Sequence, residues 1–149
     1  MLFRESMIAD IPQMHVVRCA VKENVLSNPD LITYNDYEVF ITQYGKGWVC
    51  EINSQVVGFA VVDLKKNNIW ALFILPEYEN QGIGKKLHHL MLDWYFSQKQ
   101  ENIWLSTESK SRAETFYRKT GWKDVGSYGK DEVKFEMSYE NWLNFVQNG

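Results

Sequence analysis

The sequence predicts one α/β domain spanning residues 1–149, in which helices cover both faces of a mixed, mostly antiparallel sheet. A length of 149 residues corresponds to about one domain with a single core. An apolar fraction of 45% indicates a packed globule rather than a disordered chain. Apolar runs typical of strands also alternate with segments of helical periodicity, which is the pattern of an α/β fold.

The N-terminal part is predicted to contain a strand at residues 3–7 and then a helix. Asp10 is a plausible N-cap, and Pro12 is tolerated in the first helical turn. The helix would place four apolar side chains on one face: Ile11, Met14, Val17 and Val21. The segment 28–30, Asn-Pro-Asp, interrupts the chain.

A second helix is expected to begin at Asn35 or Asp36 and to end at Gly45. Its apolar face would be formed by Tyr37, Phe40, Ile41 and Tyr44.

Three strands are predicted next, at residues 48–52, 56–64 and 69–75. The first two are joined by a tight turn at 53–54, and the third follows a turn at 65–68. Residues 56–64 are almost continuously apolar, which predicts a strand buried on both faces.

A helix is predicted after the glycines at 82 and 84. Its expected apolar stripe contains Ile83, Leu87, Leu90, Met91 and Trp94. His88 and His89 lie outside this stripe, and both are expected to face solvent.

The C-terminal third is predicted to alternate between strands and short helices. Ser111 and Glu114 have the spacing of a capping box, and Gly121 suits the position just after the helix that this box begins. The expected strands are 102–107, 122–125 and 133–137, with a short terminal helix at 141–146.

The junction at Gly82-Ile83-Gly84-Lys85 has the features of a phosphate site. The first N–H groups of a helix lack intrahelical partners, and the helix dipole is positive at that end. Glycines allow a ligand to approach the backbone closely. A Walker loop is excluded by Glu79 and Lys86, and a dinucleotide fingerprint is excluded by Leu87. An ordinary strand–helix turn remains the alternative.

Two segments resemble the signatures of the GNAT N-acetyltransferase superfamily. Residues 79–84, Glu-Asn-Gln-Gly-Ile-Gly, match the pattern Gln/Arg-x-x-Gly-x-Gly/Ala except at Glu79. Residues 112–122 resemble the Ala-x-x-Phe/Leu-Tyr-x-x-x-Gly-Phe segment, with Trp122 in place of Phe. The resemblance implies a sheet that splays open after the strand at 69–75, with acetyl-CoA entering the opening.

The resemblance also implies which groups bind acetyl-CoA. Its pyrophosphate would lie on the backbone of Asn80, Gln81, Gly82, Ile83, Gly84 and Lys85. The pantetheine arm would pair with the backbone near Phe73 and Ile74. Ser109, Lys110 and Ala113 match further positions that line the cofactor. Glu79 would repel a pyrophosphate, so its side chain is expected to turn outward.

Two groups acquire catalytic roles by the same resemblance. The backbone N–H of Ile74 would stabilise the oxyanion, and Tyr117 would act as general acid toward the departing thiolate. From the residues alone, Tyr117 would instead be interpreted as a core tyrosine stacked beside Phe116. No general base is predicted, because Glu51, Asp63 and Glu136 are expected to be solvated strand carboxylates.

Composition narrows the remaining function classes. A net charge of −3 without a basic run makes nucleic acid an unexpected partner. No apolar run reaches membrane-spanning length and no signal pattern is present, so the chain is expected to be cytoplasmic and not membrane-bound. Cys19 and Cys50 lack metal-type spacing and are expected to be reduced packing residues, so no metal is predicted.

The function predicted by the resemblance is direct transfer of an acetyl group from acetyl-CoA to a primary amine of a small molecule or protein. The alternative is a non-catalytic module that binds acyl-CoA, since Glu79 and the missing base count against turnover. The region from Ala20 to Gly47 would shape the acceptor site, and strand tryptophans are candidates for its walls. A monomer and a homodimer are both compatible with the sequence.

Overall fold

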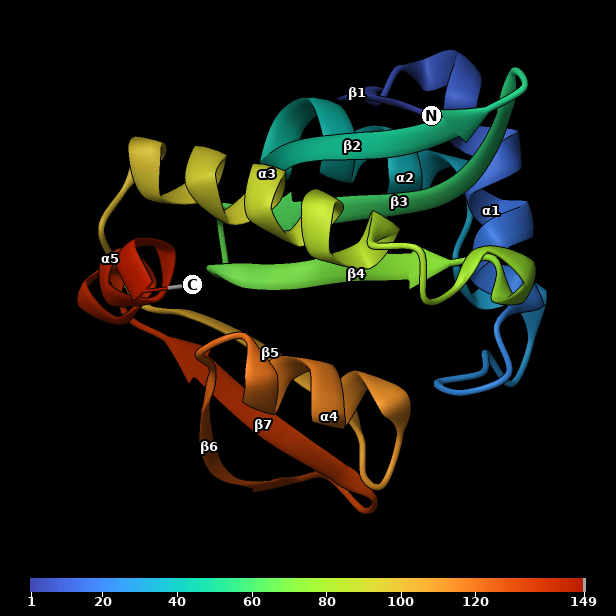
Figure 1. Cartoon of the computed structure of the whole chain (residues 1–149). Coiled ribbons are helices and arrows are strands. Elements are labelled where there is room, and N and C mark those ends of the chain that lie inside the picture. Colours follow the sequence, from blue (N-terminus) through green and yellow to red (C-terminus); the bar gives the residue numbers. More distant parts are fainter. Residues whose placement is uncertain (149) are drawn as a thin grey trace. The chain divides into compact units, whose positions relative to one another are not determined.

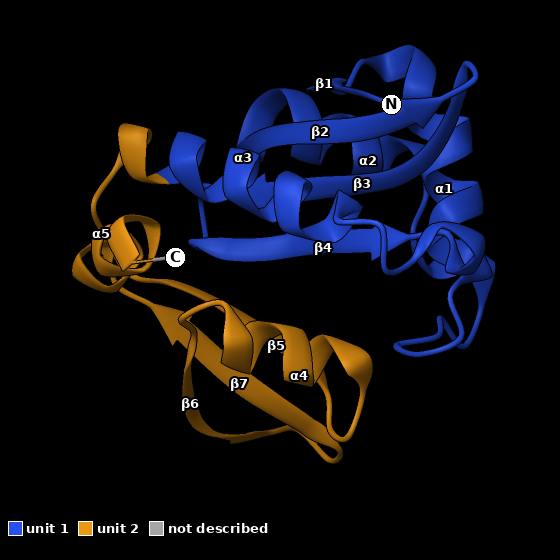
Figure 2. Cartoon of the chain, viewed as in Figure 1, with its two compact units in different colours: residues 1–95 blue, residues 96–149 orange. Residues whose placement is uncertain are grey.

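The computed structural model describes residues 1–148, which form two compact units, Met1–Tyr95 and Phe96–Gly149 (Figure 2). Each unit packs helices on an antiparallel set of strands, and the predicted α/β class is confirmed. The expected opening of the sheet concerns the placement of one unit relative to the other, and it stays a prediction.

The first unit contains four antiparallel strands in the order of the sequence. They are β1 (Leu2–Glu5), β2 (Gly45–Ile52), β3 (Gln55–Asp63) and β4 (Asn68–Ile74). Asn53 and Ser54 make the tight turn between β2 and β3, with φ angles of +51° and +65°. Every residue of β3 after Gln55 is buried, which confirms the interpretation of its apolar run.

Helices lie on the two faces of this sheet (Figure 1). On one face α1 (Ile11–Ala20) packs against β3 and β4, next to α2 (Tyr34–Val39) and the π-helical turn η3 (Phe40–Tyr44). The other face is covered by α3 (Ile83–Gln98), whose first residue faces Gly58 of β3. Short 3₁₀ turns complete the unit: η1 (Ile8–Asp10), η2 (Pro29–Leu31) and η4 (Pro76–Tyr78).

The start of α2 differs from the prediction. Thr33 is its N-cap, accepting a hydrogen bond from the Asp36 N–H at 3.2 Å, while the Asp36 carboxylate accepts the Thr33 N–H at 2.8 Å. This reciprocal pair is the capping box, with Asp in place of the usual Glu or Gln. Asn35 and Asp36, which were expected to begin the helix, therefore lie inside its first turn.

The buried face of α3 is wider than its predicted stripe, and the expected exposure of His88 is wrong. Leu90 and Trp94 of that stripe are only half-buried, whereas Leu92 and Tyr95 are fully buried. At about 100° per residue, Leu92 and Tyr95 widen the buried face of the helix to the side on which His88 lies. His88 is accordingly only 1% exposed. His89 is exposed, as expected.

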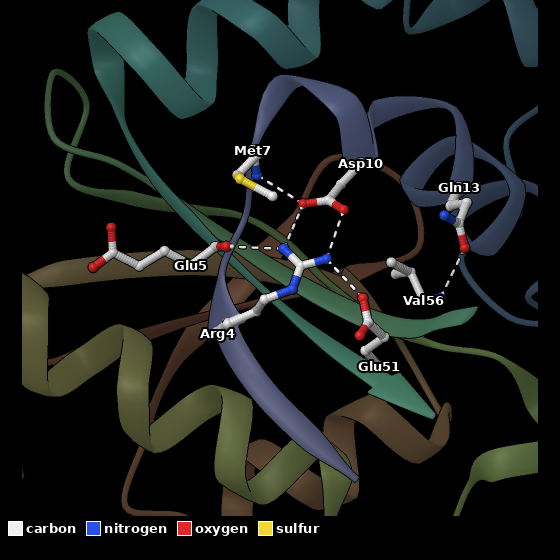
Figure 3. A network of polar contacts seen from close by, with 7 residues as sticks. All are labelled: Arg4, Glu5, Met7, Asp10, Gln13, Glu51 and Val56. Atoms are coloured by element: carbon white, nitrogen blue, oxygen red, sulfur yellow. Dashed lines mark hydrogen bonds and ion pairs between the residues drawn. The ribbon is translucent and has the colours of Figure 1, made fainter. Parts of the chain in front are cut away.

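A polar network ties β1 to η1 and β2 (Figure 3). The Arg4 guanidinium donates two hydrogen bonds to Asp10, at 2.8 and 2.9 Å, and one to Glu51 at 2.8 Å. Asp10 occupies the N-cap position of α1, but its carboxylate accepts the Met7 N–H rather than capping α1. Hydrogen bonding to Arg4 holds the pKa of Asp10 below its usual value.

The second unit contains three antiparallel strands and two helices. The strands are arranged in the order β5 (Ile103–Glu108), β7 (Glu132–Met137) and β6 (Lys123–Tyr128). The helices are α4 (Arg112–Lys119) and α5 (Tyr139–Asn148). Gly121 follows α4 with a φ of +93°, which confirms its predicted position after the helix end.

Candidate active site

The end of β4 presents the backbone of Ile74 at the edge of the strand opposite β3. The Leu75 N–H donates to the Val57 carbonyl at 2.8 Å, so the backbone groups of Leu75 face β3. Successive residues of an antiparallel strand direct their backbone groups to opposite edges. Ile74 lies opposite Gly58 of β3, one residue before the hydrogen-bonded Leu75. Its N–H is therefore directed away from β3. Ile74, more than Phe73, therefore offers backbone groups at that edge.

The glycine loop next to this strand end has the backbone that its sequence predicts. Asn80 and Gly82 are left-handed, with φ angles of +63° and +81°, and both are exposed. The Lys86 N–H donates to the Gly82 carbonyl at 3.1 Å and so closes the first turn of α3. The preceding N–H groups of that turn have no intrahelical acceptor. A Cβ built on Gly82 would meet no atom within 4 Å.

Close packing holds the start of α3 against the end of β4. A Cβ on Gly84 would lie 3.8 Å from Cγ1 of Ile74, and one on Gly58 would lie 2.7 Å from its Cδ1. The Ile74 side chain therefore lies under α3, in space that only a glycine at position 58 leaves free. The structure thus brings the predicted pyrophosphate loop and the predicted oxyanion donor together within the first unit.

Glu79 lies immediately before the glycine loop and is half-buried. Its backbone N–H donates to the Pro76 carbonyl at 3.3 Å, at the end of the 3₁₀ turn η4. The expected outward turn of its carboxylate stays a prediction.

The second unit holds the other predicted cofactor residues around the start of α4. Ser109 and Lys110 are exposed, and the Ser109 N–H donates to the Asp131 carbonyl at 2.9 Å. Lys110 is left-handed with a φ of +66°, and its N–H donates to the Glu114 carboxylate at 3.0 Å.

Ser111 confirms the predicted N-cap of α4 but not the complete capping box. Its Oγ accepts the Glu114 N–H at 3.2 Å. The Glu114 carboxylate reaches the Lys110 N–H instead of the Ser111 N–H, so the two residues do not reciprocate. Ala113, one turn before Tyr117, is half-buried.

Tyr117 is buried and surrounded by aromatic rings. It is 6% exposed, and its ring centroid lies 5.3 Å from that of Phe116, 5.6 Å from Trp122 and 6.0 Å from Phe135. Burial raises the pKa of its phenol above the ordinary value, so the hydroxyl keeps its proton at neutral pH. The surroundings of Tyr117 agree with its interpretation as a core tyrosine beside Phe116, and its role as general acid stays a prediction.

Sequence reasoning missed a polar cluster, here called the α1 cluster. It is formed by His15, Arg18 and Cys19 of α1 together with Tyr37 of α2. His15 Nδ1 lies 2.7 Å from the Tyr37 hydroxyl, and its Nε2 lies 3.5 Å from Cys19 Sγ. Cys19 is exposed, so its interpretation as a packing residue is wrong, whereas Cys50 is buried and both thiols are free. The i, i+3, i+4 spacing of the α1 residues was a visible signal, but the Tyr37 contact was not.

The strand carboxylates have structural partners. Glu51 binds Arg4 at 2.8 Å. Asp63 is 3% exposed, contrary to expectation, and accepts the Lys65 N–H at 2.8 Å in the turn after β3. Among residues 1–148 there is no cluster of metal-ligating side chains and no helix of the length and apolarity needed to cross a membrane.

Comparisons with known proteins agree with this geometry. A curated relative, the [ribosomal protein bS18]-alanine N-acetyltransferase of Haemophilus influenzae, is 28% identical over 75 residues, 49% of this chain and 51% of the relative. The chain thus spans about half the length of that relative.

Two solved structures share the fold. The PaiA N-acetyltransferase of Thermoplasma acidophilum in complex with coenzyme A superposes with a TM-score of 0.79 at 18% identity, covering 93% of this chain and 98% of the other. The yncA protein of Salmonella typhimurium with its cofactor acetyl-CoA gives 0.76 at 15% identity, covering 93% and 94%. A family model described as the acetyltransferase (GNAT) domain matches residues 43–124, more than half of the sequence. The chain belongs to the GNAT acetyltransferase family.

Proposed function

We propose that this protein is an N-acetyltransferase that moves the acetyl group of acetyl-CoA directly to a primary amine of a small molecule or protein. The observation that carries the proposal is the junction between β4 and α3. There the Ile74 N–H is directed away from β3, beside a left-handed Gly82 and the start of a helix. Helix N–H groups and the helix dipole suit a pyrophosphate.

The proposed chemistry needs one donor for the oxyanion and one for the leaving thiolate. The amine nitrogen attacks the thioester carbonyl, whose oxygen gains negative charge and accepts the Ile74 N–H. When the C–S bond breaks, the oxyanion reforms the carbonyl, and the sulfur takes the bonding electron pair and a proton from the Tyr117 hydroxyl. The new amide nitrogen releases its extra proton to solvent, and the phenol regains a proton from solvent. A protonated phenol is required for this step, and the raised pKa of Tyr117 supplies it.

A second candidate function is a module that binds acyl-CoA without turnover. Glu79 favours it, because a half-buried carboxylate next to the loop would weaken pyrophosphate binding. The two strand carboxylates engaged in structural contacts, Glu51 and Asp63, also leave the general base unassigned. A buried tyrosine at the family's acid position favours the enzyme instead.

The two functions are separated by turnover and by Tyr117→Phe. Release of free thiol from acetyl-CoA is measured across a panel of amines, and mass spectrometry identifies the acetylated product. The proposal predicts amine-dependent thiol release that falls by about 100-fold or more in Tyr117→Phe, with acetyl-CoA affinity unchanged. Phe116→Leu serves as a control for packing, because Phe116 is the neighbouring ring without a hydroxyl. Equal turnover in Tyr117→Phe would remove its catalytic role, and binding without turnover of any amine would favour the second function.

A further inference from the structure

Arg18 is a cationic side chain that is partly buried although one of its nitrogen atoms lacks a hydrogen-bond partner among residues 1–148. The residue is half-buried on α1, and its guanidinium carbon lies 4.1 Å from the centroid of the Phe73 ring. Its Nη1 is buried and has no hydrogen-bond partner among residues 1–148. A buried donor without a partner destabilises the fold, and more so when it is charged.

Among residues 1–148, no carboxylate forms an ion pair with Arg18. Burial lowers the pKa of Arg18, and neither of the two groups that act against this effect, Tyr37 and Cys19, is a carboxylate. Both of these groups contact His15: the Tyr37 hydroxyl lies 2.7 Å from its Nδ1, and Cys19 Sγ lies 3.5 Å from its Nε2. By contrast, Arg4 in the same unit is held by two carboxylates. An anion that reached Arg18 would therefore form an ion pair with a cation that is already partly desolvated and has no carboxylate partner among residues 1–148.

The place of Arg18 connects it to the proposed reaction. Neighbouring residues on a strand direct their side chains to opposite faces. The Ile74 side chain lies under α3, so the Phe73 ring points to the face that carries α1, where Arg18 covers it. The guanidinium therefore lies over the side chain of Phe73, the residue that precedes Ile74. The backbone N–H of Ile74 is the group proposed to hold the thioester oxygen.

The Phe73 ring gives the guanidinium a defined platform. Its centroid lies 6.0 Å from that of Phe59, which in turn lies 6.3 Å from Tyr37. A planar guanidinium over an aromatic ring keeps its N–H groups available in its own plane, where a carboxylate accepts two of them side by side. A second ammonium group on the acceptor would instead be repelled by Arg18.

We propose that Arg18 binds a carboxylate on the acceptor, so that the acceptor is an amine carrying a carboxylate near the amino group. This inference rests on the proposed acetyltransferase function and narrows its substrate class. Polyamines and simple alkylamines, which lack the anion, are then poor acceptors.

The test compares matched acceptors that differ only in the carboxylate. Free amino acids, their amides and their decarboxylated amines are assayed for kcat/KM with saturating acetyl-CoA. The wild-type protein should prefer the acids by roughly ten- to hundred-fold, the range of a charge-assisted hydrogen-bonded pair. Arg18→Met should reduce this preference to a few-fold by lowering kcat/KM for the acids far more than for the amides, with the affinity for acetyl-CoA retained. Arg18→Lys should retain part of the preference, because it keeps the charge but loses the planar fork.

Lys22→Met is the matched control, since it removes one positive charge from an exposed residue just beyond α1 and should leave the preference intact. Wild-type turnover of amides or polyamines as fast as of the acids would overturn the inference while leaving the proposed function standing. An equal loss for all acceptors in Arg18→Met would also overturn it. Absence of both acetyl-CoA binding and turnover would instead refute the proposed function.

Discussion

The burial of one imidazole, that of His88, makes the stability of this protein depend on pH. Burial, reinforced by the neighbouring His89, lowers the pKa of His88 to about 3 from its ordinary value of 6.5. The unfolded chain takes up a proton near pH 6.5, whereas the folded protein does not. The stabilisation is therefore complete above pH 6.5 and is lost as the pH falls toward 3.

We expect the free energy of unfolding to fall by about 2 kcal/mol between pH 7 and pH 5 through His88 alone. Urea denaturation at the two pH values measures this loss. His88→Leu removes the titrating group, so its stability should change less with pH than that of the wild type, whatever its stability at pH 7. His89→Leu, at the exposed neighbour on the same helix, should keep the dependence. An equal pH dependence in wild type and His88→Leu would disprove the assignment.

Single residues also mark the limit of sequence reasoning. Gly121 and the Ser111 cap were predictable because both roles depend on local backbone conformation. His88 and Arg18 were not, since their burial depends on which neighbours the fold brings to them. The contact between Arg18 and Phe73 joins residues far apart in the sequence, and no local pattern announces it.

At the scale of elements, the loop between β4 and α3 carries the proposed cofactor site. Gly82→Asp places a negative charge in a loop where an added Cβ meets no protein atom, so any loss of binding would come from the ligand side. We expect acetyl-CoA affinity to be abolished in titration calorimetry, because the new carboxylate repels the pyrophosphate. The protein should stay folded at a cost of about 1–2 kcal/mol for a non-glycine residue with positive φ.

The chain offers a matched control in Gly129→Asp. Gly129 also has a positive φ, of +60°, and an added Cβ there meets no atom within 4 Å. Its variant should pay a similar conformational cost and bind acetyl-CoA normally. Wild-type affinity in folded Gly82→Asp would remove the pyrophosphate from this loop.

Most elements were predictable to within a few residues because their signals are local. The nearly continuous apolar run of β3 and the Asn53-Ser54 turn predicted the central hairpin. The start of α2 was missed because its capping box uses Asp36 at the place where Glu or Gln is usual. The π-helical turn η3, which joins α2 directly to β2, has no sequence signature that separates it from a continuing helix.

At the scale of the whole molecule, the GNAT family match over residues 43–124 includes the candidate site at the end of β4. The family signatures predicted the loop and the strand end, because both rely on glycines and backbone groups whose positions follow from the motif. The acceptor side was predictable only as a region. Its proposed chemistry rests on Arg18 of α1, and the contacts of the α1 side chains became visible only in the folded chain.

The central claim is that this chain binds acetyl-CoA, and the most direct test is thermal unfolding of the purified protein with and without excess acetyl-CoA. ATP and NADH serve as controls, since they carry phosphates but no pantetheine arm. Acetyl-CoA at a hundred times its dissociation constant should stabilise the folded state by about 2.7 kcal/mol, seen as a rise in Tm that neither control produces. An unchanged Tm with acetyl-CoA, or an equal rise with ATP, would contradict the account.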